Sequence, residues 1–284
     1  MIIGVIGTGR VGTILAAALR SAGHEVVAAT RVSPLLPEVE PLPAEDVARA
    51  ATDLLLIAVP DDALAGVVAR LAAARAFGPG QIVVHTSGAQ GLGVLRPATA
   101  LGARPLALHP VMTFTGAVQD LARLRGISFG VTAPEDLRAL ATRIVADLGG
   151  FPEWIGEGRR VMYHASLAHS ANHLVTLVND AADRLRDAGV VRPERVLRPL
   201  LEAALDNALR MGDNALTGPV SRGDAGTVAR HVEALRDTPS LTTYLALARR
   251  TADRAIASGR LRATDAEALL DGLAAVNQTV GAAR

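Results

Sequence analysis

The stretch that decides the fold is Met1 to Gly23, MIIGVIGTGRVGTILAAALRSAG. A short apolar run leads directly into a glycine pattern, and apolar residues then recur at helical spacing. This order of strand, glycine turn and helix is the dinucleotide-binding fingerprint in its required context. Gly7 permits the tight turn, Gly9 lets the backbone approach a pyrophosphate, and Gly12 lets helix and strand pack closely. The predicted cofactor-binding residues of the turn are Gly7, Thr8, Gly9, Arg10, Val11 and Gly12.

The end of the next predicted strand bears on which dinucleotide is bound. Residues 24–29, HEVVAA, are that strand, and Thr30, Arg31 and Ser33 follow it. In dinucleotide-binding folds this strand end meets the adenosine ribose, where an acidic residue selects a free 2'-hydroxyl and an arginine accommodates a 2'-phosphate. Arg31 and the two neighbouring hydroxyl groups therefore predict NADP, although a solvated surface arginine is the alternative.

The rest of the chain divides into a strand-rich and a helical part. Five further strands are predicted, over 54–60, 81–89, 104–109, 127–131 and 151–156. The run 54–60, LLLIAVP, is typical of a parallel strand buried on both faces, and its last residues, Val59 and Pro60, are expected near the cofactor. From about Gly158 helical spacing replaces strand-like runs. We therefore predict an α/β protein, with an N-terminal Rossmann doubly wound, mainly parallel sheet at 1–156 and an all-α substrate and dimerisation domain at 157–284.

Polar residues gather at two of the predicted strand ends. Ser87 follows one strand, and His109 ends another directly before Pro110, which holds its backbone extended. Ligands bind outside the carboxyl ends of strands in open α/β sheets, so both residues are candidates for catalysis and substrate binding. A histidine that only satisfies a neighbouring carbonyl is the alternative for His109.

The first helix of the second domain, predicted over 159–188, carries an unusual polar stripe. Helical spacing places His164 and Asn172 on one face, which indicates a ligand-facing surface or a solvated one. We expect both to act in catalysis, with Asn172 also contacting the substrate. His169 and His173 are one turn apart, but no third metal ligand lies within sequence reach, so no metal site is predicted.

A glycine-rich loop, LTGPVSRGD at 216–224, interrupts the helical part. It offers hydroxyl groups, backbone N–H groups and the fixed charge of Arg222 to an anion. We therefore expect Arg222 to bind a substrate carboxylate, although an ordinary interhelical loop would look similar.

Composition excludes several kinds of chemistry. The chain has 284 residues and a formal net charge of +1, which argues against a nucleic-acid or membrane surface role. It has no cysteine, which excludes disulfides and thiolate metal sites and fits the cytoplasm. No apolar run reaches the roughly 18 residues of a membrane span, and the first strand is too short for a signal peptide. All 29 basic residues are arginines, so no lysine can act as proton donor.

Five segments together resemble a known family: GTGRVG, VVHTSGA, ALHPVMTF, YHASLAHSANHLVTLV and LTGPVSRGD. The chain resembles the Rossmann-like oxidoreductases with a family-specific helical C-terminal domain, which are relatives of the 6-phosphogluconate dehydrogenase C-terminal-domain superfamily. That superfamily includes ketopantoate reductase, pyrroline-5-carboxylate reductase and prephenate dehydrogenase. The resemblance implies an NADP-dependent reductase or dehydrogenase.

The resemblance also implies roles for particular residues of the site. Ketopantoate reductases use a lysine on the first helix of the second domain, so its absence here leaves His109 or His164 as the proton donor, since their unperturbed pKa suits it. Asn172 matches the polar position that follows in that helix, and the His109-Pro110 pair resembles a motif that lines the substrate site of prephenate dehydrogenases. We expect hydride transfer between NADPH and a small carboxylate-bearing carbonyl compound, for which a ketopantoate-like molecule is one candidate. An imine reductase resembling pyrroline-5-carboxylate reductase and a non-catalytic NADPH sensor are the alternatives, and a homodimer is expected.

Overall fold

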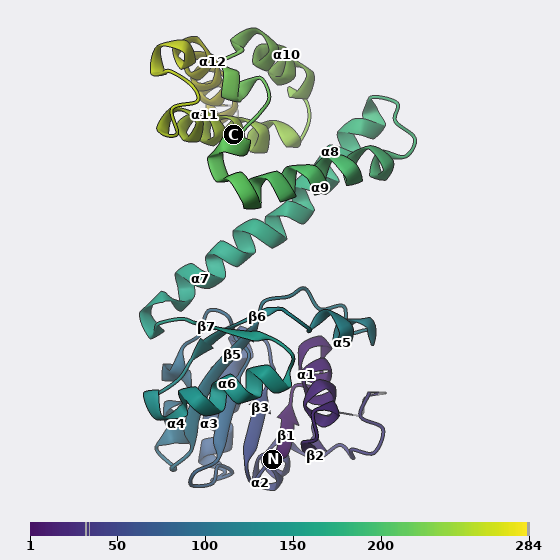
Figure 1. Ribbon diagram of the computed structural model, residues 1–284, viewed down its shortest axis with the longest axis vertical. Coiled ribbons are helices and arrows are strands. Elements are labelled where there is room, and N and C mark those ends of the chain that lie inside the picture. The colour runs from purple at the N-terminus through teal and green to yellow at the C-terminus, as the bar shows by residue number, and fades with distance from the viewer. Residues whose placement is uncertain (32, 34, 283–284) are drawn as a thin grey trace. The chain divides into compact units, whose positions relative to one another are not determined.

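The structure is a computed structural model that describes residues 1–31, 33 and 35–282 (Figure 1). The side chains of 277–282 lie outside this description, as do the last two residues of the predicted second domain. Contacts between Cα atoms divide the chain into two compact units, Met1–His173 and Leu174–Arg284. The predicted domain boundary after residue 156 stays a prediction.

A seven-stranded sheet forms the centre of the first unit, in the order β2-β1-β3-β4-β5-β6-β7. The strands are β1 (Ile2–Ile6), β2 (Glu25–Ala29), β3 (Leu54–Ile57), β4 (Ile82–His85), β5 (Arg104–Pro110), β6 (Ser128–Thr132) and β7 (Phe151–Trp154). Only β5 and β6 pair antiparallel. The predicted seven strands and the mainly parallel sheet are confirmed. Strands β3 and β4 are buried along their whole length, as continuous apolar runs require.

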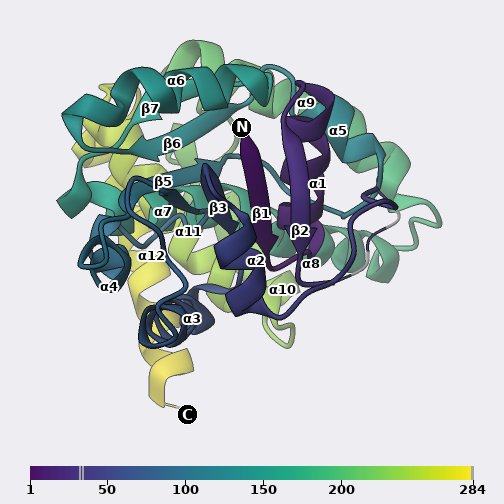
Figure 2. The same cartoon turned by 90° about the horizontal axis from the view of Figure 1, so that it is seen from below.

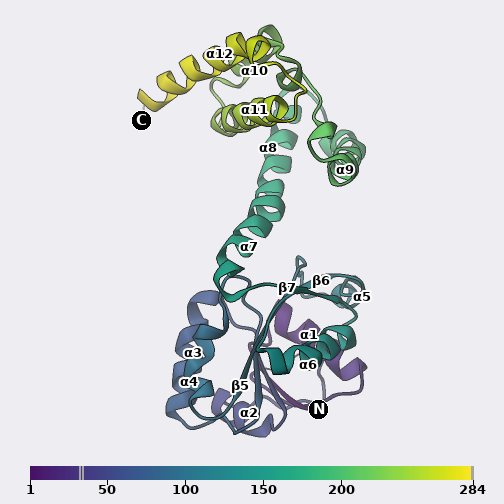
Figure 3. The same cartoon turned by 60° about the vertical axis from the view of Figure 1, so that its left-hand side comes forward.

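Helices cover both faces of this sheet (Figures 2 and 3). They are α1 (Arg10–Ser21), α2 (Ala44–Ala50), α3 (Asp61–Ala73), α4 (Arg96–Thr99), α5 (Gln119–Arg123) and α6 (Arg138–Asp147). Buried side chains of α1 and α6 form one core with Val5 and Leu56, whereas those of α2, α3 and α4 form a second core with Leu55 and Ile57. Alternate residues of one strand thus feed opposite cores, and the carboxyl ends of β1 to β5 lie at one edge of the sheet.

The helix predicted over 159–188 is not one continuous α-helix. It consists of α7 (Arg160–Leu167), a π-helical segment (Ala168–Asn172) and α8 (His173–Asp187). The predicted helical range is confirmed, and the difference is that the segment 168–172 takes the wider π-helical turn. Such segments occur often at functional sites.

The remaining helices of the second unit are α9 (Pro193–Met211), α10 (Ala225–Leu235), α11 (Ser240–Ala257) and α12 (Ala263–Ala282). Residues of α10, α11 and α12 share an aliphatic core that includes Val232, Leu245 and Leu273. The helical character predicted for this part is confirmed. Among the described residues, no helix is long and apolar enough to cross a membrane.

Candidate functional site

The glycine turn after β1 contains two glycines that packing requires and one that it does not. A Cβ built on Gly7, whose φ is +90°, would lie 2.4 Å from the carbonyl oxygen of Ala58, and one on Gly12 would lie 2.2 Å from the carbonyl oxygen of Gly7. A Cβ on Gly9 meets no heavy atom of the described residues within 4 Å. Packing among the described residues therefore does not require glycine at this position.

Helix α1 begins at this turn with its backbone N–H groups uncapped. No side chain accepts a hydrogen bond at its N-terminus, and its first turn contains no acidic residue. The turn is tied to the end of β2, because the N–H of Gly7 donates to the hydroxyl oxygen of Thr30 at 3.1 Å. Free N–H groups and the positive end of the helix dipole favour an anion here.

A cavity of about 540 Å³ opens in front of this turn. Seven of the predicted cofactor-binding residues line it: Gly7, Thr8, Gly9, Thr30, Arg31, Val59 and Pro60. Arg70 of α3 lines it as well, and its Nε lies 2.9 Å from a carboxylate oxygen of Glu45. The sequence analysis missed Arg70 because no motif marks it, and the packing of α3 against the sheet is what brings it to the cavity.

The other predicted cofactor-binding residues do not line this cavity. Ser33 is only 4% exposed, and its hydroxyl accepts the N–H of Leu35 at 3.3 Å, within a local turn. Val11 and Gly12 belong to the first turn of α1, where Val11 is half-buried and Gly12 is buried. The side chain of Arg10 lies against Gly116, in the loop that follows β5.

A second cluster lies where β5 ends, and it contains both predicted catalytic histidines, His109 and His164. Nδ1 of His109 lies 2.9 Å from the hydroxyl oxygen of Tyr163. The rings of His109 and His164 meet edge to face, with 5.7 Å between centroids. A Cβ on Gly88 would lie 2.4 Å from Cδ2 of His164 and 3.0 Å from Nε2 of His109, so the glycine of the TSG segment makes room for both rings.

Both members of the hydrogen-bonded pair are uncharged near neutral pH. Burial, with the nearby positive charges of His164 and Arg160, lowers the pKa of His109 to about 4. Burial raises the pKa of Tyr163 to about 12, against the opposing effect of Arg160. The pair therefore holds a phenol hydroxyl and one ring N–H as its exchangeable protons.

Arg160 is a buried cation beneath this cluster. It is 1% exposed, and it donates from Nη1 to the hydroxyl of Thr132 at 2.9 Å and from Nη2 to the carbonyl of Ser87 at 2.6 Å. Its Nε has no hydrogen-bond partner, and none of the ion pairs among the described residues includes it. Its guanidinium carbon lies 6.0 Å from the ring centroid of Tyr163. The sequence analysis missed both Arg160 and Tyr163, although both belong to the helix it singled out.

Ser87 takes part in this cluster through its backbone. Its hydroxyl accepts the N–H of Gln90 at 3.0 Å, and its own N–H donates to Nδ1 of His85 at 3.2 Å. Nε2 of His85 must then carry the proton that it donates to the carbonyl of Gly91, which defines one neutral tautomer. Burial lowers the pKa of His85 to about 4, in agreement with that state.

Two predicted substrate-binding residues have exposed side chains. Asn172 lies in the π-helical segment and makes no hydrogen bond to the His109 cluster. Arg222 belongs to the second unit, in the loop before α10. His169 and His173 place their Nδ1 atoms 3.3 Å apart, and the described residues contain no group of three metal-binding side chains. The substrate-binding roles of Asn172 and Arg222 stay predictions.

Comparisons with known proteins agree with this architecture. A profile for a Rossmann-like domain matches residues 1–110, and one for the domain of unknown function DUF2520 matches residues 127–251. Comparison with curated proteins gives no match.

Three solved structures share the fold. Protein BF3122 of Bacteroides fragilis, described as a candidate NADP oxidoreductase, has a TM-score of 0.73 and 22% identity over 89% of this chain and 98% of that one. Protein TM1727 of Thermotoga maritima has a TM-score of 0.69 and 20% identity over 91% of this chain and 99% of that one. The pyrroline carboxylate reductase of Plasmodium falciparum, solved with NADP bound, has a TM-score of 0.58 and 13% identity over 91% of this chain and 98% of that one. The two profile matches and the shared fold agree with the family resemblance: a Rossmann-like domain is followed along the chain by a region that matches the DUF2520 domain.

Proposed function

We propose that this protein is an NADP-dependent oxidoreductase. The observation that carries the proposal is the cavity in front of the glycine turn. Its lining includes seven of the residues that were predicted to bind the cofactor. The residues fit a dinucleotide, because a Cβ on Gly9 would stand in open space and the N-terminus of α1 is uncapped. Gly9 and the first turn of α1 would hold the pyrophosphate.

The preference for NADP over NAD rests on two arginines. Arg31 and Arg70 line the same cavity, at the strand end that meets the adenosine ribose in this fold. Arg31 is exposed and takes part in none of the ion pairs recorded for the described chain. Arginine suits a phosphate because its planar guanidinium can donate two parallel hydrogen bonds.

The histidine and tyrosine pair is proposed to supply the proton. Bound NADPH would supply the hydride. When the Tyr163 hydroxyl donates to Nδ1 of His109, the neutral imidazole carries its proton on Nε2, which has no hydrogen-bond partner in the described part of the chain. Nε2 can give that proton to the substrate while Nδ1 takes the phenol proton, and the buried charge of Arg160 stabilises the tyrosinate that results.

For the substrate we propose a small carboxylate-bearing carbonyl compound, ketopantoate-like in size. One observation favours imine reduction as the second candidate. With a pKa of about 4, His109 is not an imidazolium near neutral pH, and an iminium substrate asks less of a protein acid because it arrives protonated. The likeness to pyrroline carboxylate reductase, at 13% identity, is one of fold.

The test combines cofactor binding with turnover. NADPH oxidation is followed with ketopantoate, pyrroline-5-carboxylate and a panel of 2-oxo acids, beside fluorescence titrations with NADPH and NADH. We expect Arg31→Gln and Arg70→Gln to weaken NADPH binding by about tenfold or more each while NADH binding changes little. Arg143→Gln, an exposed arginine on α6, is the matched control. Equal affinity of the wild type and both variants for NADPH would contradict the proposed cofactor site.

Turnover tests the proton relay separately. Tyr163→Phe removes the hydroxyl that Nδ1 of His109 faces, so we expect kcat to fall by about 100-fold or more while the Kd for NADPH stays unchanged. Full turnover in Tyr163→Phe would refute the relay. Tight NADPH binding by the wild type with no turnover on any compound of the panel would favour a sensor.

We also propose that the protein is a cytoplasmic homodimer. Five large apolar side chains of α9 are exposed: Val196 (46%), Leu200 (61%), Leu205 (55%), Leu209 (80%) and Met211 (43%). Apolar side chains that gather on one helix mark an interaction surface, and a second copy would cover them. Light scattering on wild type and Leu200→Glu is the test, with a dimer and a monomer expected. A wild-type monomer would contradict the proposal.

A further inference from the structure

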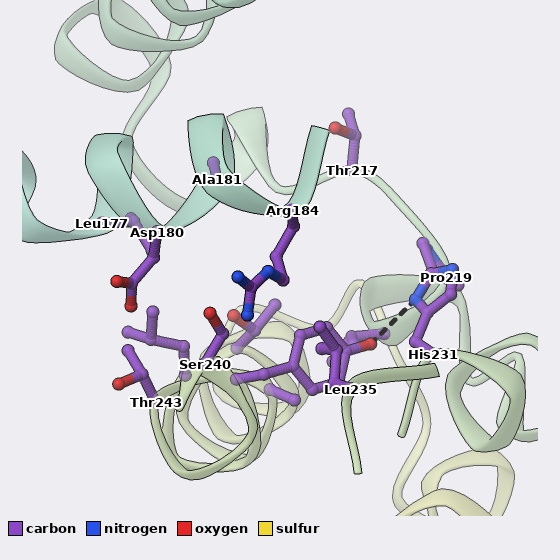
Figure 4. A pocket seen from close by; sticks show the side chains of 15 residues that line it. Leu177, Asp180, Ala181, Arg184, Thr217, Pro219, His231, Leu235, Ser240 and Thr243 are labelled. Atoms are coloured by element: carbon purple, nitrogen blue, oxygen red, sulfur yellow. Dashed lines mark hydrogen bonds between the residues drawn. The ribbon is translucent and has the colours of Figure 1, made fainter. Parts of the chain in front are cut away.

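A cavity of about 400 Å³ lies within the helical unit (Figure 4). Helix α8 forms one wall, the start of α11 forms another, and residues 217–220 and α10 complete the lining. Its volume falls within the range of small-molecule pockets, about 300–1,000 Å³. Much of the lining is apolar, including Leu177, Leu235, Leu247 and Ala248.

Two polar groups in this cavity lack the hydrogen bonds that buried groups normally make. The Oγ of Ser240, a residue that is 8% exposed, has no partner, and neither has the Nε of Arg184. Asp187 forms an ion pair with Arg184, with 2.9 Å between Nε and a carboxylate oxygen. The Nε–H bond does not point at that oxygen, however, so the two groups form no hydrogen bond. Both groups are donors, and an unsatisfied buried donor costs free energy that a ligand acceptor recovers.

A carboxylate without a partner lines the same cavity. Asp180 lies one helical turn before Arg184 and takes part in no hydrogen bond or ion pair among the described residues. Figure 4 shows the side chains of Asp180 and Arg184 projecting from α8 into the space where Ser240 begins α11. The cavity thus presents a negative group, a positive group and a hydroxyl donor beside apolar walls.

We propose that this cavity binds an apolar α-amino acid as its zwitterion. The ligand's carboxylate would accept from Nε of Arg184 and Oγ of Ser240, its ammonium would donate to Asp180, and its side chain would pack on Leu235 and Ala248. A phosphate ester fits less well, because it has no ammonium group to pair with Asp180, whose carboxylate would repel a dianion. The inference does not depend on the NADP site, since none of these residues belongs to it.

Binding of three probes to the full-length protein tests the proposal by calorimetry in the absence of NADPH. L-leucine carries both charges, 4-methylpentanoate lacks the ammonium, and 3-methylbutylamine lacks the carboxylate. We expect L-leucine to bind best. Arg184→Gln should weaken L-leucine and 4-methylpentanoate about tenfold or more, whereas Asp180→Asn should weaken L-leucine and leave 4-methylpentanoate unchanged. Ser240→Ala is a milder change that should weaken both carboxylates.

The same helix offers matched controls. Asp183 and Arg186 form an exposed ion pair on α8, with 2.7 Å between the charged groups, and neither lines the cavity. Asp183→Asn and Arg186→Gln should therefore bind L-leucine like the wild type. No binding of L-leucine, equal losses in the control variants, or unchanged affinity in Asp180→Asn and Arg184→Gln would each overturn the proposal. Light scattering that shows dissociation of a dimer in Arg184→Gln, with no binding of L-leucine, would assign the cavity to a second copy of the chain instead.

Discussion

Replacing Gly9 with alanine tests whether this glycine is needed for NADPH binding or for the packing of the folded chain. The backbone of Gly9, at φ −85° and ψ −156°, is extended and open to alanine, and the new Cβ meets no heavy atom of the described residues within 4 Å. We therefore expect the free energy of unfolding to change by no more than about 0.5 kcal/mol. The methyl group would, however, stand where a pyrophosphate approaches the backbone.

The expected loss of binding follows from the hydrogen bonds that this approach allows. One hydrogen bond from a backbone N–H to a charged phosphate contributes about 1.5–3 kcal/mol, so losing one raises the Kd for NADPH by about 10- to 100-fold. Gly12→Ala is the contrasting variant, because its Cβ would lie 2.2 Å from the carbonyl oxygen of Gly7. Relieving that overlap costs about 1–3 kcal/mol of stability.

Urea unfolding and fluorescence titration with NADPH, carried out on both variants, are the assays. Gly9→Ala should keep wild-type stability and lose affinity, whereas Gly12→Ala should lose stability. If Gly9→Ala bound NADPH as tightly as the wild type, the assignment of the pyrophosphate to this turn would be refuted. A large loss of stability in Gly9→Ala would instead show that Gly9 has a packing role.

Three further predictions concern buried groups of the first unit. The unfolded chain protonates His85 near pH 6.5 but the folded chain only near pH 4, so His85 should contribute up to about 3 kcal/mol to a fall in the free energy of unfolding as pH drops through this window. His109 adds to the same fall, and urea unfolding of His85→Gln should therefore show a shallower fall than the wild type. Gly88→Ala places a Cβ 2.4 Å from His164 and should lower kcat in the NADPH oxidation assay without changing the Kd for NADPH. Asp120 is fully buried and accepts the N–H groups of the loop after β5, so Asp120→Asn should lower the midpoint of thermal unfolding in calorimetry.

Each of these has a clear contrary result. If the free energy of unfolding of the wild type stayed constant between pH 6.5 and 4, folding would not lower the pKa of His85, which would contradict the prediction. Weaker NADPH binding in Gly88→Ala would mean that the histidine cluster and the cofactor cavity are not separate. A wild-type unfolding midpoint in Asp120→Asn would show that the buried carboxylate does not stabilise the loop.

The amino-acid sequence by itself determined the order of strands and helices and the place of the glycine turn. These features depend on short-range patterns, since a fully buried strand needs a continuous apolar run and the turn needs glycine at Gly7 and Gly12. The predicted cofactor residues that line the cavity all follow strand ends, and parallel strands bring such ends to one edge. Ser33 also follows the end of β2 but does not line the cavity, because it is buried in the local turn after that strand.

Only the tertiary structure decided which side chains surround His109 and which arginine joins Arg31. Tyr163 meets His109 across 54 positions of sequence, and Arg160 reaches the carbonyl of Ser87 across 73. No spacing rule links residues so far apart, because their contact depends on where α7 begins relative to β4, β5 and β6. Arg70 reaches the cavity in front of the glycine turn for the same reason: its position follows from how α3 packs on the sheet, and no motif in the sequence encodes that packing.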